Sequence, residues 1–464
     1  MAILRALWGD RSDWRLRFPL RPNAPRLRLS WVGPIVLIGT TLFGWLAFKD
    51  AIGDEDNVAF ALFIGSVSII LMAWSNVLAT RWRALESFFG GLDRMYRWHR
   101  WFGALSVAAM WFHIQTIDDV KGIRGASKSV ADSAEDLAGT AETLLYILVI
   151  ISLIRWVPYR WWKWTHKLMI VPFVFASWHF HTATKPYANN DAWGRWFQAL
   201  MLLGIFAWVY RVVWGDIFSR GRRHVISAIN RNDLTTCVEM TPYGRPLRHR
   251  TGQFVFIKMA GRKVMEPHPF TISSHPDDPV LRVHIKELGD WSASFHQHVS
   301  IGDIVRIEGP YGRLPLFPRS PTTTVWIAGG VGITPFLGAV KDAQAVENVP
   351  HLFYAVRSRI DAPGLDELER AHNEGRIKLH LYVSQEDSRL CADDLQREFG
   401  LHGFHSAHVV MCGPDKLVRS MTKAARSMGA KHVHVEAFDI RSGVGPDLSV
   451  EIEQLVHSAR KRRA

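Results

Sequence analysis

Two apolar stretches, WHRWFGALSVAAMWFHI at 98–114 and WTHKLMIVPFVFASWHFH at 164–181, carry histidines near both of their ends. An α-helix turns about 100° and rises ~1.5 Å per residue, so His99 and His113 lie ~40° apart around the axis and ~21 Å apart along it. Both side chains therefore face one side of the first helix, at two depths of a hydrocarbon layer roughly 30 Å thick.

The second stretch repeats this arrangement, with His166 near its start and His179 and His181 near its end. Neutral imidazole is a common axial ligand of haem iron, and side chains from two facing helices can hold one macrocycle between them. A single histidine in an apolar helix usually serves packing, but matched pairs of histidines are costly in lipid and indicate function. We therefore expect two b-type haems between the two stretches.

The choice of the outer ligand on the second helix stays open on geometry alone. Measured from His166, an ideal helix places His181 ~60° and His179 ~140° around the axis, which favours His181. Pro172 lies between these positions and can kink the helix or shift its phase. Both histidines are candidates on this basis.

Composition and charge exclude several classes of protein. The 464 residues carry a formal net charge of +13 and three cysteines, Cys237, Cys391 and Cys412, without CxxC spacing. This excludes a disulfide framework and a cysteine-based iron–sulfur or zinc site, and it suits a reducing compartment. The arginines crowd before the first apolar run and after the last, as at the flanks of membrane segments, which disfavours nucleic-acid binding. We expect no cleaved signal peptide, because the basic N-terminal stretch ends in no small-residue cleavage site.

Six membrane spans are expected, at about 31–48, 58–78, 99–117, 140–157, 164–183 and 195–217. Acidic residues occupy the first and third loops, and arginines occupy the second and fourth. Because basic loops stay in the cytoplasm, both termini are expected on the cytoplasmic side of the plasma (inner) membrane. His99 and His166 then lie at the cytoplasmic level, and His113 and His179 at the outer level. The stretch 127–139 is expected to form an exposed outer loop.

From about residue 222 the pattern becomes that of a soluble α/β protein. Short alternating runs separated by Gly and Pro, such as FVFIKM at 254–259, predict an antiparallel barrel over 222–318. Strand–helix alternation then predicts a parallel sheet covered by helices over 322–441. Residues 1–30 are expected to form a basic cytoplasmic segment, and 442–464 a tail. A barrel followed by a parallel α/β unit is a two-domain reductase arrangement.

The run TTVWIAGGVGITPFLGAV combines a strand, a glycine turn and the start of a helix. Its glycines let the backbone approach a ligand, and the helix N-terminus offers N–H groups to a pyrophosphate, although such turns also serve packing alone. The glycines are Gly329, Gly330 and Gly332. The next strand ends in Arg357, Ser358 and Arg359, where an adenosine ribose lies in such folds. Two arginines and a hydroxyl suit a 2′-phosphate and favour NADPH over NADH.

Taken together, the six spans, the paired histidines and the series HPFTISS, GDWS, GPYG, GGVGITPF and CGP resemble the NADPH oxidase and ferric reductase superfamily. The resemblance covers the chain from about 31 to 441. HPFT followed by GDWS is closer to NADPH oxidases than to soluble ferredoxin reductases, which usually carry an Arg-x-Tyr-Ser motif there. It implies a six-helix transmembrane haem-binding bundle followed by a ferredoxin-reductase-like module, with an antiparallel β-barrel FAD domain and an α/β parallel-sheet NADPH domain. The sequence shows no EF-hand.

The resemblance also implies the residues that bind flavin and nucleotide. The flavin and its phosphates would contact His268, Pro269, Phe270 and Thr271, with Ser273 and Ser274 nearby. The FAD pyrophosphate would contact Gly289, Asp290, Trp291 and Ser292. The NADPH pyrophosphate would contact Gly329, Gly330, Gly332 and Thr334.

Two residues are implied at the site of hydride transfer, and the outer haem ligand is also implied. Cys412 would lie by the nicotinamide with Gly413 and Pro414, and Phe438 would stack on the flavin ring, although the chain runs on beyond it. The family's fifth-span pair is spaced as His166 and His179 are here. The resemblance thus favours His179, with His181 in reserve.

The implied activity is electron transfer from cytosolic NADPH through FAD and two stacked haems to an acceptor on the outer side, most simply O₂ giving superoxide. A ferric-chelate reductase, or an electron donor to a periplasmic reductase, would use the same electron-transfer path through FAD and two haems. A haem carrier or proton-conducting membrane protein with a regulatory flavin domain is an alternative of a different class. The expected partners are membrane lipid and a small acceptor, and regulatory subunits are not evident.

Overall fold

The structure is a computed structural model that describes residues 29–49, 56–117, 122–154, 157, 159–217, 221–232, 234–259, 267–318, 322–345, 348–386, 389–400, 404–405, 407–430 and 432–436. These residues form two compact units, one within 1–218 and one within 219–439. The expected tail 442–464, the segment 1–28 and Phe438 lie outside the described residues.

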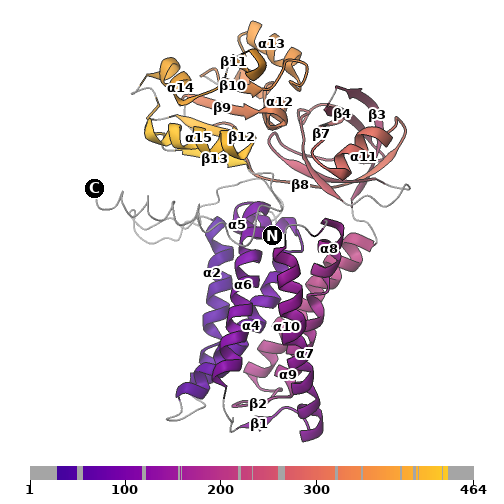
Figure 1. Ribbon diagram of the computed structural model, residues 1–464, viewed down its shortest axis with the longest axis vertical. Coiled ribbons are helices and arrows are strands. Elements are labelled where there is room, and N and C mark those ends of the chain that lie inside the picture. Colours follow the sequence, from indigo (N-terminus) through magenta and orange to yellow (C-terminus); the bar gives the residue numbers. More distant parts are fainter. Residues whose placement is uncertain are drawn as a thin grey trace. The chain divides into compact units, whose positions relative to one another are not determined.

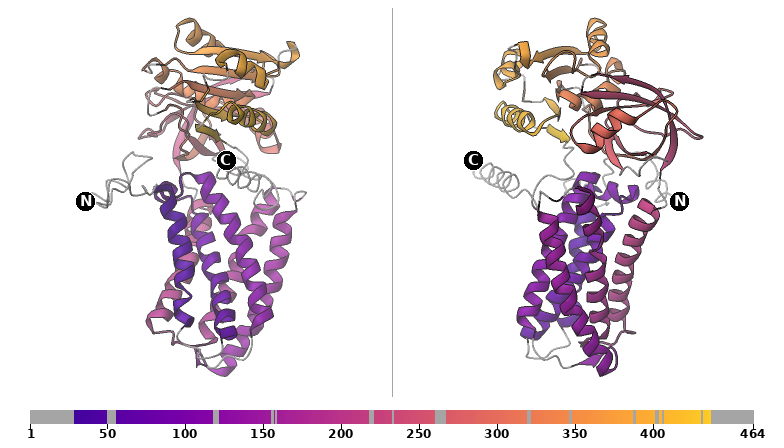
Figure 2. Two further views of the ribbon diagram at one scale, coloured as in Figure 1. Left: turned by 90° about the vertical axis from the view of Figure 1, so that its left-hand side faces the viewer. Right: turned by 45° about the vertical axis from the view of Figure 1, so that its right-hand side comes forward.

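The first unit is a bundle of long helices that run alongside one another (Figure 1, Figure 2). Its helices are α2 (Leu29–Phe43), α3 (Leu46–Lys49), α4 (Asp56–Leu78), α5 (Arg83–Phe89), α6 (Leu92–Thr116), α7 (Lys128–Leu153), α8 (Tyr159–Lys167), α9 (Ile170–Thr182), α10 (Ala192–Val209) and the π-helix η1 (Tyr210–Ile217). Two short strands, β1 (Ile123–Arg124) and β2 (Thr184–Lys185), lie at one end of the bundle, and α5 and α8 lie at the other (Figure 1).

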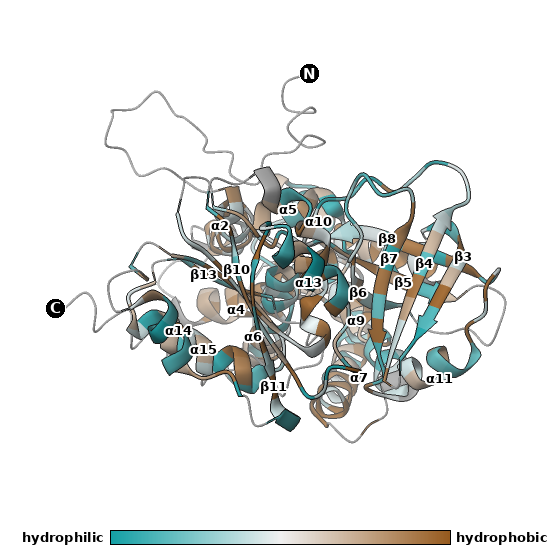
Figure 3. Cartoon of the chain, turned by 90° about the horizontal axis from the view of Figure 1, so that it is seen from above, coloured by the Kyte–Doolittle hydropathy of each residue, from teal (hydrophilic) through white to brown (hydrophobic). Residues whose placement is uncertain are grey.

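Four helical segments of the described chain are long and apolar enough to cross a membrane: Leu29–Phe48, Val58–Leu78, Lys128–Leu153 and Ala192–Gly215. Large apolar side chains such as Leu42, Leu202 and Phe206 point outward from them with more than half of their surface exposed, as expected of helices that face lipid. In Figure 3 α2 and α7 are largely brown, the hydrophobic end of the scale, whereas α13 and α14 of the second unit are largely teal.

The two helical regions that carry the histidines are less apolar or are interrupted. α6 spans 25 residues but begins with the charged sequence LDRMYRWHR. The expected span 164–183 is divided, because α8 ends at Lys167 and α9 starts at Ile170. Pro172 occupies the first turn of α9, where a missing N–H costs least. The sequence analysis allowed a kink at Pro172; the structure instead divides the expected span into two helices just before the proline.

The expected outer loop 127–139 is wrong, because these residues form the first turns of α7. Alanines at 131, 134, 138 and 141 repeat at helical spacing, and Ala134 and Ala141 are buried. Alanine has the highest helix propensity but little hydrophobic surface. A stripe of alanines among charged residues therefore looks like a polar loop in the sequence.

The second unit begins with an antiparallel barrel. Its strands are β3 (Arg222–Arg231), β4 (Thr235–Pro242), β5 (Phe254–Met259), β6 (His268–Thr271), β7 (Leu281–Lys286) and β8 (Ile304–Tyr311), in the order β6-β5-β8-β3-β4-β7. A bridge between Ile272 and Val283 joins the two outer strands of this order and closes the barrel. The inward faces bury Ile226, Val255 and Val283 completely. Helix α11 (Asp290–His298) follows β7.

A five-stranded parallel sheet follows, as the sequence predicts. Its strands are β9 (Thr324–Gly329), β10 (His351–Val356), β11 (Lys378–Val383), β12 (His408–Cys412) and β13 (His432–Glu436), in the order β11-β10-β9-β12-β13. The helical segments are η2 (Gly330–Ile333), α12 (Thr334–Ala339), η3 (Asp342–Ala345), α13 (Leu365–Asn373), η4 (Ser384–Glu386), α14 (Ala392–Phe399) and α15 (Asp415–Ser427). From β9 the chain adds β10 and β11 on one side, and it then adds β12 and β13 on the other side of β9. Open α/β sheets bind ligands at such a switch point, which here lies between β9 and β12.

Candidate functional site

The inner histidine pair meets between α6 and α8. The ring centroids of His99 and His166 lie 5.9 Å apart, with the ring planes at 75°. Metal–imidazole bonds are about 2.0–2.1 Å long, so two imidazoles on opposite sides of one metal have centroids roughly 6 Å apart. The structure thus brings together two predicted ligands from distant parts of the chain at a separation that suits a shared metal.

Hydrogen bonds to the other ring nitrogen orient both inner histidines. His99 Nδ1 lies 2.9 Å from the carbonyl oxygen of Ser75, which can only accept, so His99 donates there. His166 Nδ1 lies 3.2 Å from the hydroxyl of Ser152, whose own proton goes to the carbonyl of Leu148 at 2.7 Å. Both rings therefore carry their proton on Nδ1 and the lone pair on Nε2, the arrangement of metal-ligating histidines.

The outer level repeats this pattern on α6. His113 Nδ1 donates to the carbonyl oxygen of Ala61 at 2.9 Å. This ring lies so close to α4 that a Cβ at Gly65 would stand 2.7 Å from His113 Nδ1. Glycine at 65 is thus needed for the bond to Ala61, and that bond fixes the tautomer of His113.

His179 and His181 differ in their surroundings. His179 Nδ1 is buried and has no hydrogen-bond partner among the described residues, and His113 is within electrostatic range of this side chain. His181 Nδ1 lies 3.5 Å from Nε2 of Gln198, and its ring stacks on Trp178 at 6.1 Å. Among the described residues, His179 thus lacks the kind of Nδ1 partner that the other three predicted ligands have, and the choice between His179 and His181 stays a prediction.

A short antiparallel pair joins the C-terminal ends of α6 and α9, the two helices that carry His113 and His179. β1 follows α6 and β2 follows α9, and Ile123 pairs with Lys185. Gly122 and Gly125 permit the contact, since a Cβ at either would stand 2.4 Å or less from a carbonyl oxygen of the other segment. The pair holds the ends of α6 and α9, which carry His113 and His179, at one level. The sequence analysis did not find it, because two-residue strands leave no pattern.

The geometry of the bundle fits haem groups between these helices. Three of the predicted ligands hold their proton on Nδ1, and the fourth has an orphaned buried nitrogen. α6 packs along α4, and α9 packs along α7. On α6, a Cβ at Gly103 would meet no atom within 4 Å, so there is open space beside this residue, one turn after His99. Trp162, one of several tryptophans near the ends of the expected spans, stacks on His166 at 5.2 Å.

The predicted flavin residues gather on β6 and the start of α11. The Trp291 ring stacks on His268 at 4.6 Å and lies 5.4 Å from Phe270. Thr271 Oγ1 and Trp291 Nε1 are both buried without a hydrogen-bond partner in the described chain. Two orphaned donors beside an aromatic cluster suit a ring that carries acceptor atoms, as a flavin does.

The neighbouring serines make internal bonds instead. Ser273 is fully buried and donates to the carbonyl of Arg282 at 3.1 Å. Ser274 is also buried, and its hydroxyl accepts from the backbone N–H of Arg282 at 3.1 Å. Ser292 accepts from the N–H of Gly289 at 3.1 Å and closes the first turn of α11. Their side chains shape the strand end and the helix start, and any contact with FAD stays a prediction.

The glycine turn and the CGP motif lie against each other at the switch point between β9 and β12. A Cβ on Gly332 would stand 2.4 Å from the carbonyl oxygen of Cys412, and one on Gly329 would stand 2.6 Å from Pro414. Gly413 has a φ of +158° and lies close to the backbone of Gly329. The glycines therefore serve close packing, and the same packing brings the two predicted NADPH segments together. Thr334 is buried, and its hydroxyl donates to Val331.

Cys412 is completely buried at the end of β12. Burial raises the pKa of its thiol well above the usual range, so the side chain is an uncharged thiol at neutral pH. It is thus suited to packing beside an apolar ring and not to nucleophilic attack.

The predicted 2′-phosphate residues follow the carboxyl end of β10. Arg357 is exposed, and the hydroxyl of Ser358 accepts from the N–H of Asp361 at 3.3 Å. Arg359 pairs with Glu369 at 3.5 Å and with Glu386 at 3.4 Å. The sequence analysis did not anticipate these two carboxylates, which come from α13 and η4.

Three family matches divide the chain as the fold does. Residues 64–177, which include His99, His113 and His166, match the family described as "Ferric reductase like transmembrane component". Residues 222–314 match "FAD-binding domain" and residues 326–423 match "Oxidoreductase NAD-binding domain".

Individual relatives match parts of the chain. It is 30% identical over 209 residues to the carnitine monooxygenase reductase subunit of Escherichia coli (strain K12), covering 44% of this chain and 63% of that protein. It is 26% identical over 167 residues to NADPH oxidase 1 of Mus musculus, covering 35% and 27%. It is 23% identical over 256 residues to dual oxidase 1 of Homo sapiens, covering 47% and 16%. The chain thus spans less than two thirds of each of these relatives.

A transmembrane component, an FAD-binding domain and an NAD-binding domain follow one another in a single chain that is also similar to NADPH oxidases. The protein therefore belongs to the ferric reductase-like flavocytochrome superfamily.

Proposed function

We propose that the protein carries electrons from cytosolic NADPH through FAD and two b-type haems to a small acceptor on the outer side of the plasma membrane, with O₂ as the acceptor and superoxide as the product. When bound, FAD takes up two electrons as a hydride and releases them singly, which suits haem iron because it accepts one at a time. The remaining task of the protein is to position these groups.

The observation that supports this proposal best is the approach of His99 to His166 at 5.9 Å. His99 and His166 would hold the inner haem, and His113 and His179 the outer one. The carbonyl oxygens of Ser75 and Ala61 and the hydroxyl of Ser152 keep the Nδ1 proton on three of these rings. Such second partners fix the tautomer and raise the basicity of the ligating nitrogen.

The proposal takes α6 and the α8–α9 pair as spans in addition to the four apolar segments. α6 has 25 residues and so extends ~37 Å, enough to cross a hydrocarbon core of roughly 30 Å. Its charged residues lie in the first turns, at the end that the basic loops assign to the cytoplasm. Six spans place both ends of the bundle, and with them the FAD and NADPH domains, on the cytoplasmic side.

In the second unit, the proposed flavin contacts are Thr271 and Trp291, whose buried donors have no hydrogen-bond partner in the part of the chain that the structure describes. The turn Gly329–Gly332 would lie along the NADPH pyrophosphate, with Arg357 and Arg359 at the 2′-phosphate. Arginine recognises phosphate through paired N–H donors, which supports NADPH over NADH.

Lys185 gives the outer level a positive charge. Its Nζ donates to the carbonyl oxygens of Phe180, His181 and Ala183 at 2.8–3.2 Å. Burial lowers the pKa of Lys185 to about 8, so the ammonium is still mostly charged at neutral pH. A fixed cation stabilises the negative charge that an acceptor gains on reduction, which supports a small acceptor such as O₂ at this level.

The test uses full-length protein in detergent, loaded with FAD and haem. Without oxygen, NADPH should bleach the flavin and shift the haem bands; in air, dye reduction should be sensitive to superoxide dismutase. His99→Leu should keep the flavin bleaching and lose the fast haem reduction. Ferric-chelate reduction that superoxide dismutase does not affect would make iron the acceptor. A chain that binds one haem or none would overturn the proposal.

A further inference from the structure

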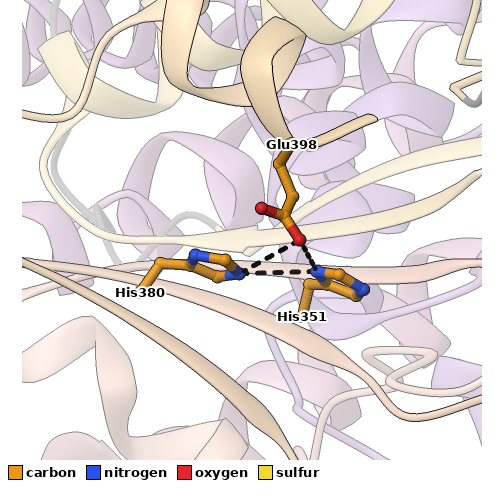
Figure 4. A group of neighbouring side chains, drawn as sticks. All are labelled: His351, His380 and Glu398. Atoms are coloured by element: carbon orange, nitrogen blue, oxygen red, sulfur yellow. Dashed lines mark hydrogen bonds and ion pairs between the residues drawn. The ribbon is translucent and has the colours of Figure 1, made fainter. Parts of the chain in front are cut away.

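A second group of histidines lies in the α/β domain and takes no part in the proposed electron path. His351 is the first residue of β10, His380 lies within β11, and Glu398 lies in the last turn of α14. One ligand atom from each lies within 4.8 Å of the other two. Figure 4 shows the three side chains pointing toward one another from the two strands and the helix.

Two of the three distances between these atoms are close to those of a tetrahedral metal site, and the third is about 0.5 Å longer. His351 Nδ1 lies 3.2 Å from Glu398 Oε1 and 3.4 Å from His380 Nε2, and His380 Nε2 lies 3.9 Å from Glu398 Oε1. Zn²⁺ binds imidazole and carboxylate at about 2.0–2.2 Å, so neighbouring ligands of a tetrahedral site stand roughly 3.3–3.5 Å apart. An octahedral arrangement would bring them to roughly 3 Å, which is closer than any of the three distances.

The surroundings hold the two imidazoles in place for this role. The His351 and His380 rings stack at 5.6 Å with their planes 10° apart, and the His380 ring lies parallel to that of Phe353 at 4.4 Å. Phe399 packs against His351 at 4.7 Å. These contacts fix the orientation of both rings.

We propose that His351 Nδ1, His380 Nε2 and Glu398 Oε1 bind one Zn²⁺ ion, with water in the fourth position. Neutral imidazoles and a carboxylate are borderline ligands that suit zinc, and three protein ligands are the usual number where one position stays open. Glu398 is the most exposed of the three, so the ion can enter from solvent beside α14.

The site would stabilise the α/β domain and lie away from the residues proposed for NADPH. His351 begins β10, whereas Arg357 follows the last residue of that strand. Six residues of a β-strand extend ~20 Å, so the zinc lies at the far end of the strand from the residues proposed for NADPH. The ion would join β10, β11 and α14, and we expect it to raise the melting temperature without altering the affinity for NADPH.

The experiment uses the full-length, haem-loaded protein without a polyhistidine tag. The protein is treated with a chelator, incubated with zinc sulfate and freed of excess metal by gel filtration. Zinc and iron are then measured together by mass spectrometry. His380→Gln and Glu398→Gln test the site, because both positions are accessible and need not disturb folding. His405→Gln is the matched control, since His405 is an exposed histidine of the same unit.

We expect one zinc ion per chain in the unmodified protein and in His405→Gln, and at least a tenfold lower content in the two site variants. Zinc should raise the melting temperature of the unmodified protein and of His405→Gln, and it should not raise that of the two site variants. Flavin content shows that each variant is folded. The proposal is overturned if folded, unmodified protein retains no zinc, or if both site variants retain as much as the control.

Discussion

Gln198 of α10 contacts His181 of α9: its Nε2 lies 3.5 Å from the Nδ1 of that histidine. The carbonyl oxygen of His181 also accepts from Lys185 and Asn189. His181 is thus part of the network that ends α9, whereas the buried Nδ1 of His179 has no hydrogen-bond partner among the described residues. The two histidines, two positions apart, have different roles in this structure.

The first prediction separates these two histidines. His179→Leu should lower the haem content from two per chain to one, because the outer haem loses an axial ligand. His181→Leu should keep both haems and lower only stability, since it removes the contact with Gln198. The pyridine haemochrome assay, normalised to protein and flavin, measures this. The opposite result would make His181 the outer ligand, as ideal helix geometry from His166 suggests.

The second prediction concerns the orphaned hydroxyl of Thr271. Valine has the same shape, so Thr271→Val should not destabilise the protein without FAD, because the hydroxyl has no hydrogen-bond partner among the described residues. If this hydroxyl binds the flavin, the variant loses one hydrogen bond worth about 0.5–1.5 kcal/mol, and the dissociation constant of FAD should rise about 2- to 10-fold. Flavin fluorescence on titration measures the constant.

Thr241→Val is the matched control for that measurement. Thr241 lies on β4, and its hydroxyl donates to the carbonyl of Val225 at 3.4 Å. This substitution should cost stability and leave FAD affinity unchanged. Equal FAD affinity in Thr271→Val and the unmodified protein would show that the hydroxyl does not reach the flavin.

The sequence predicted the parts of the fold in which pattern and burial agree. TVWIAG of β9 is apolar throughout and fully buried, and FVFIKM forms β5 of the barrel. The paired histidines predicted that His99 lies beside His166, because two helices that cross the membrane in a known direction leave few other ways to pair their histidines. These features depend on local periodicity and on loop charge.

Other features depend on contacts between distant residues and left no signal. α7 begins twelve residues before the expected span because its inward stripe is alanine. The β1–β2 pair is too short for a strand pattern. His351, His380 and Glu398 come from three elements with no motif spacing. The parallel register of β10 and β11, which pairs Phe353 with His380, and the position of α14 together bring them close. The carboxylates around Arg359 likewise come from α13 and η4.

A third prediction follows from the pairing of Arg359 with Glu386 at 3.4 Å. Both side chains are exposed, and such a pair is worth about 0.2–1 kcal/mol. A bound 2′-phosphate would have to compete for this guanidinium. Glu386→Gln should therefore lower the KM for NADPH about 1.5- to 5-fold and leave the KM for NADH unchanged.

Steady-state dye reduction with both nucleotides checks this, and Glu374→Gln serves as the control because Glu374 pairs with Arg376 instead. Arg359→Ala should raise the KM for NADPH and leave that for NADH unchanged. A change of equal size for both nucleotides would place Arg359 away from the 2′-phosphate.

The last prediction concerns acid stability. His284 is buried in the barrel, and its Nδ1 donates to Ser273 at 3.0 Å. Burial, helped by Arg282, lowers the pKa of His284 to about 3 from the ordinary 6.5. Between these values the unfolded chain binds a proton that the folded chain does not, so stability falls as pH falls below 6.5. From pH 7 to pH 5 this single group should cost about 2 kcal/mol.

His284→Asn removes the titrating group and keeps a side-chain N–H that can donate to Ser273. The variant should therefore show a flatter dependence of the melting temperature of the flavin-binding unit on pH, between pH 7 and pH 5, than the unmodified protein. His405→Asn should leave that dependence unchanged, because His405 is exposed and is hydrated in both states. If the melting temperature of His284→Asn depends on pH as steeply as that of the unmodified protein, then His284 of the unmodified protein binds its proton in the folded state as well. The acid sensitivity would then have its origin elsewhere in the unit.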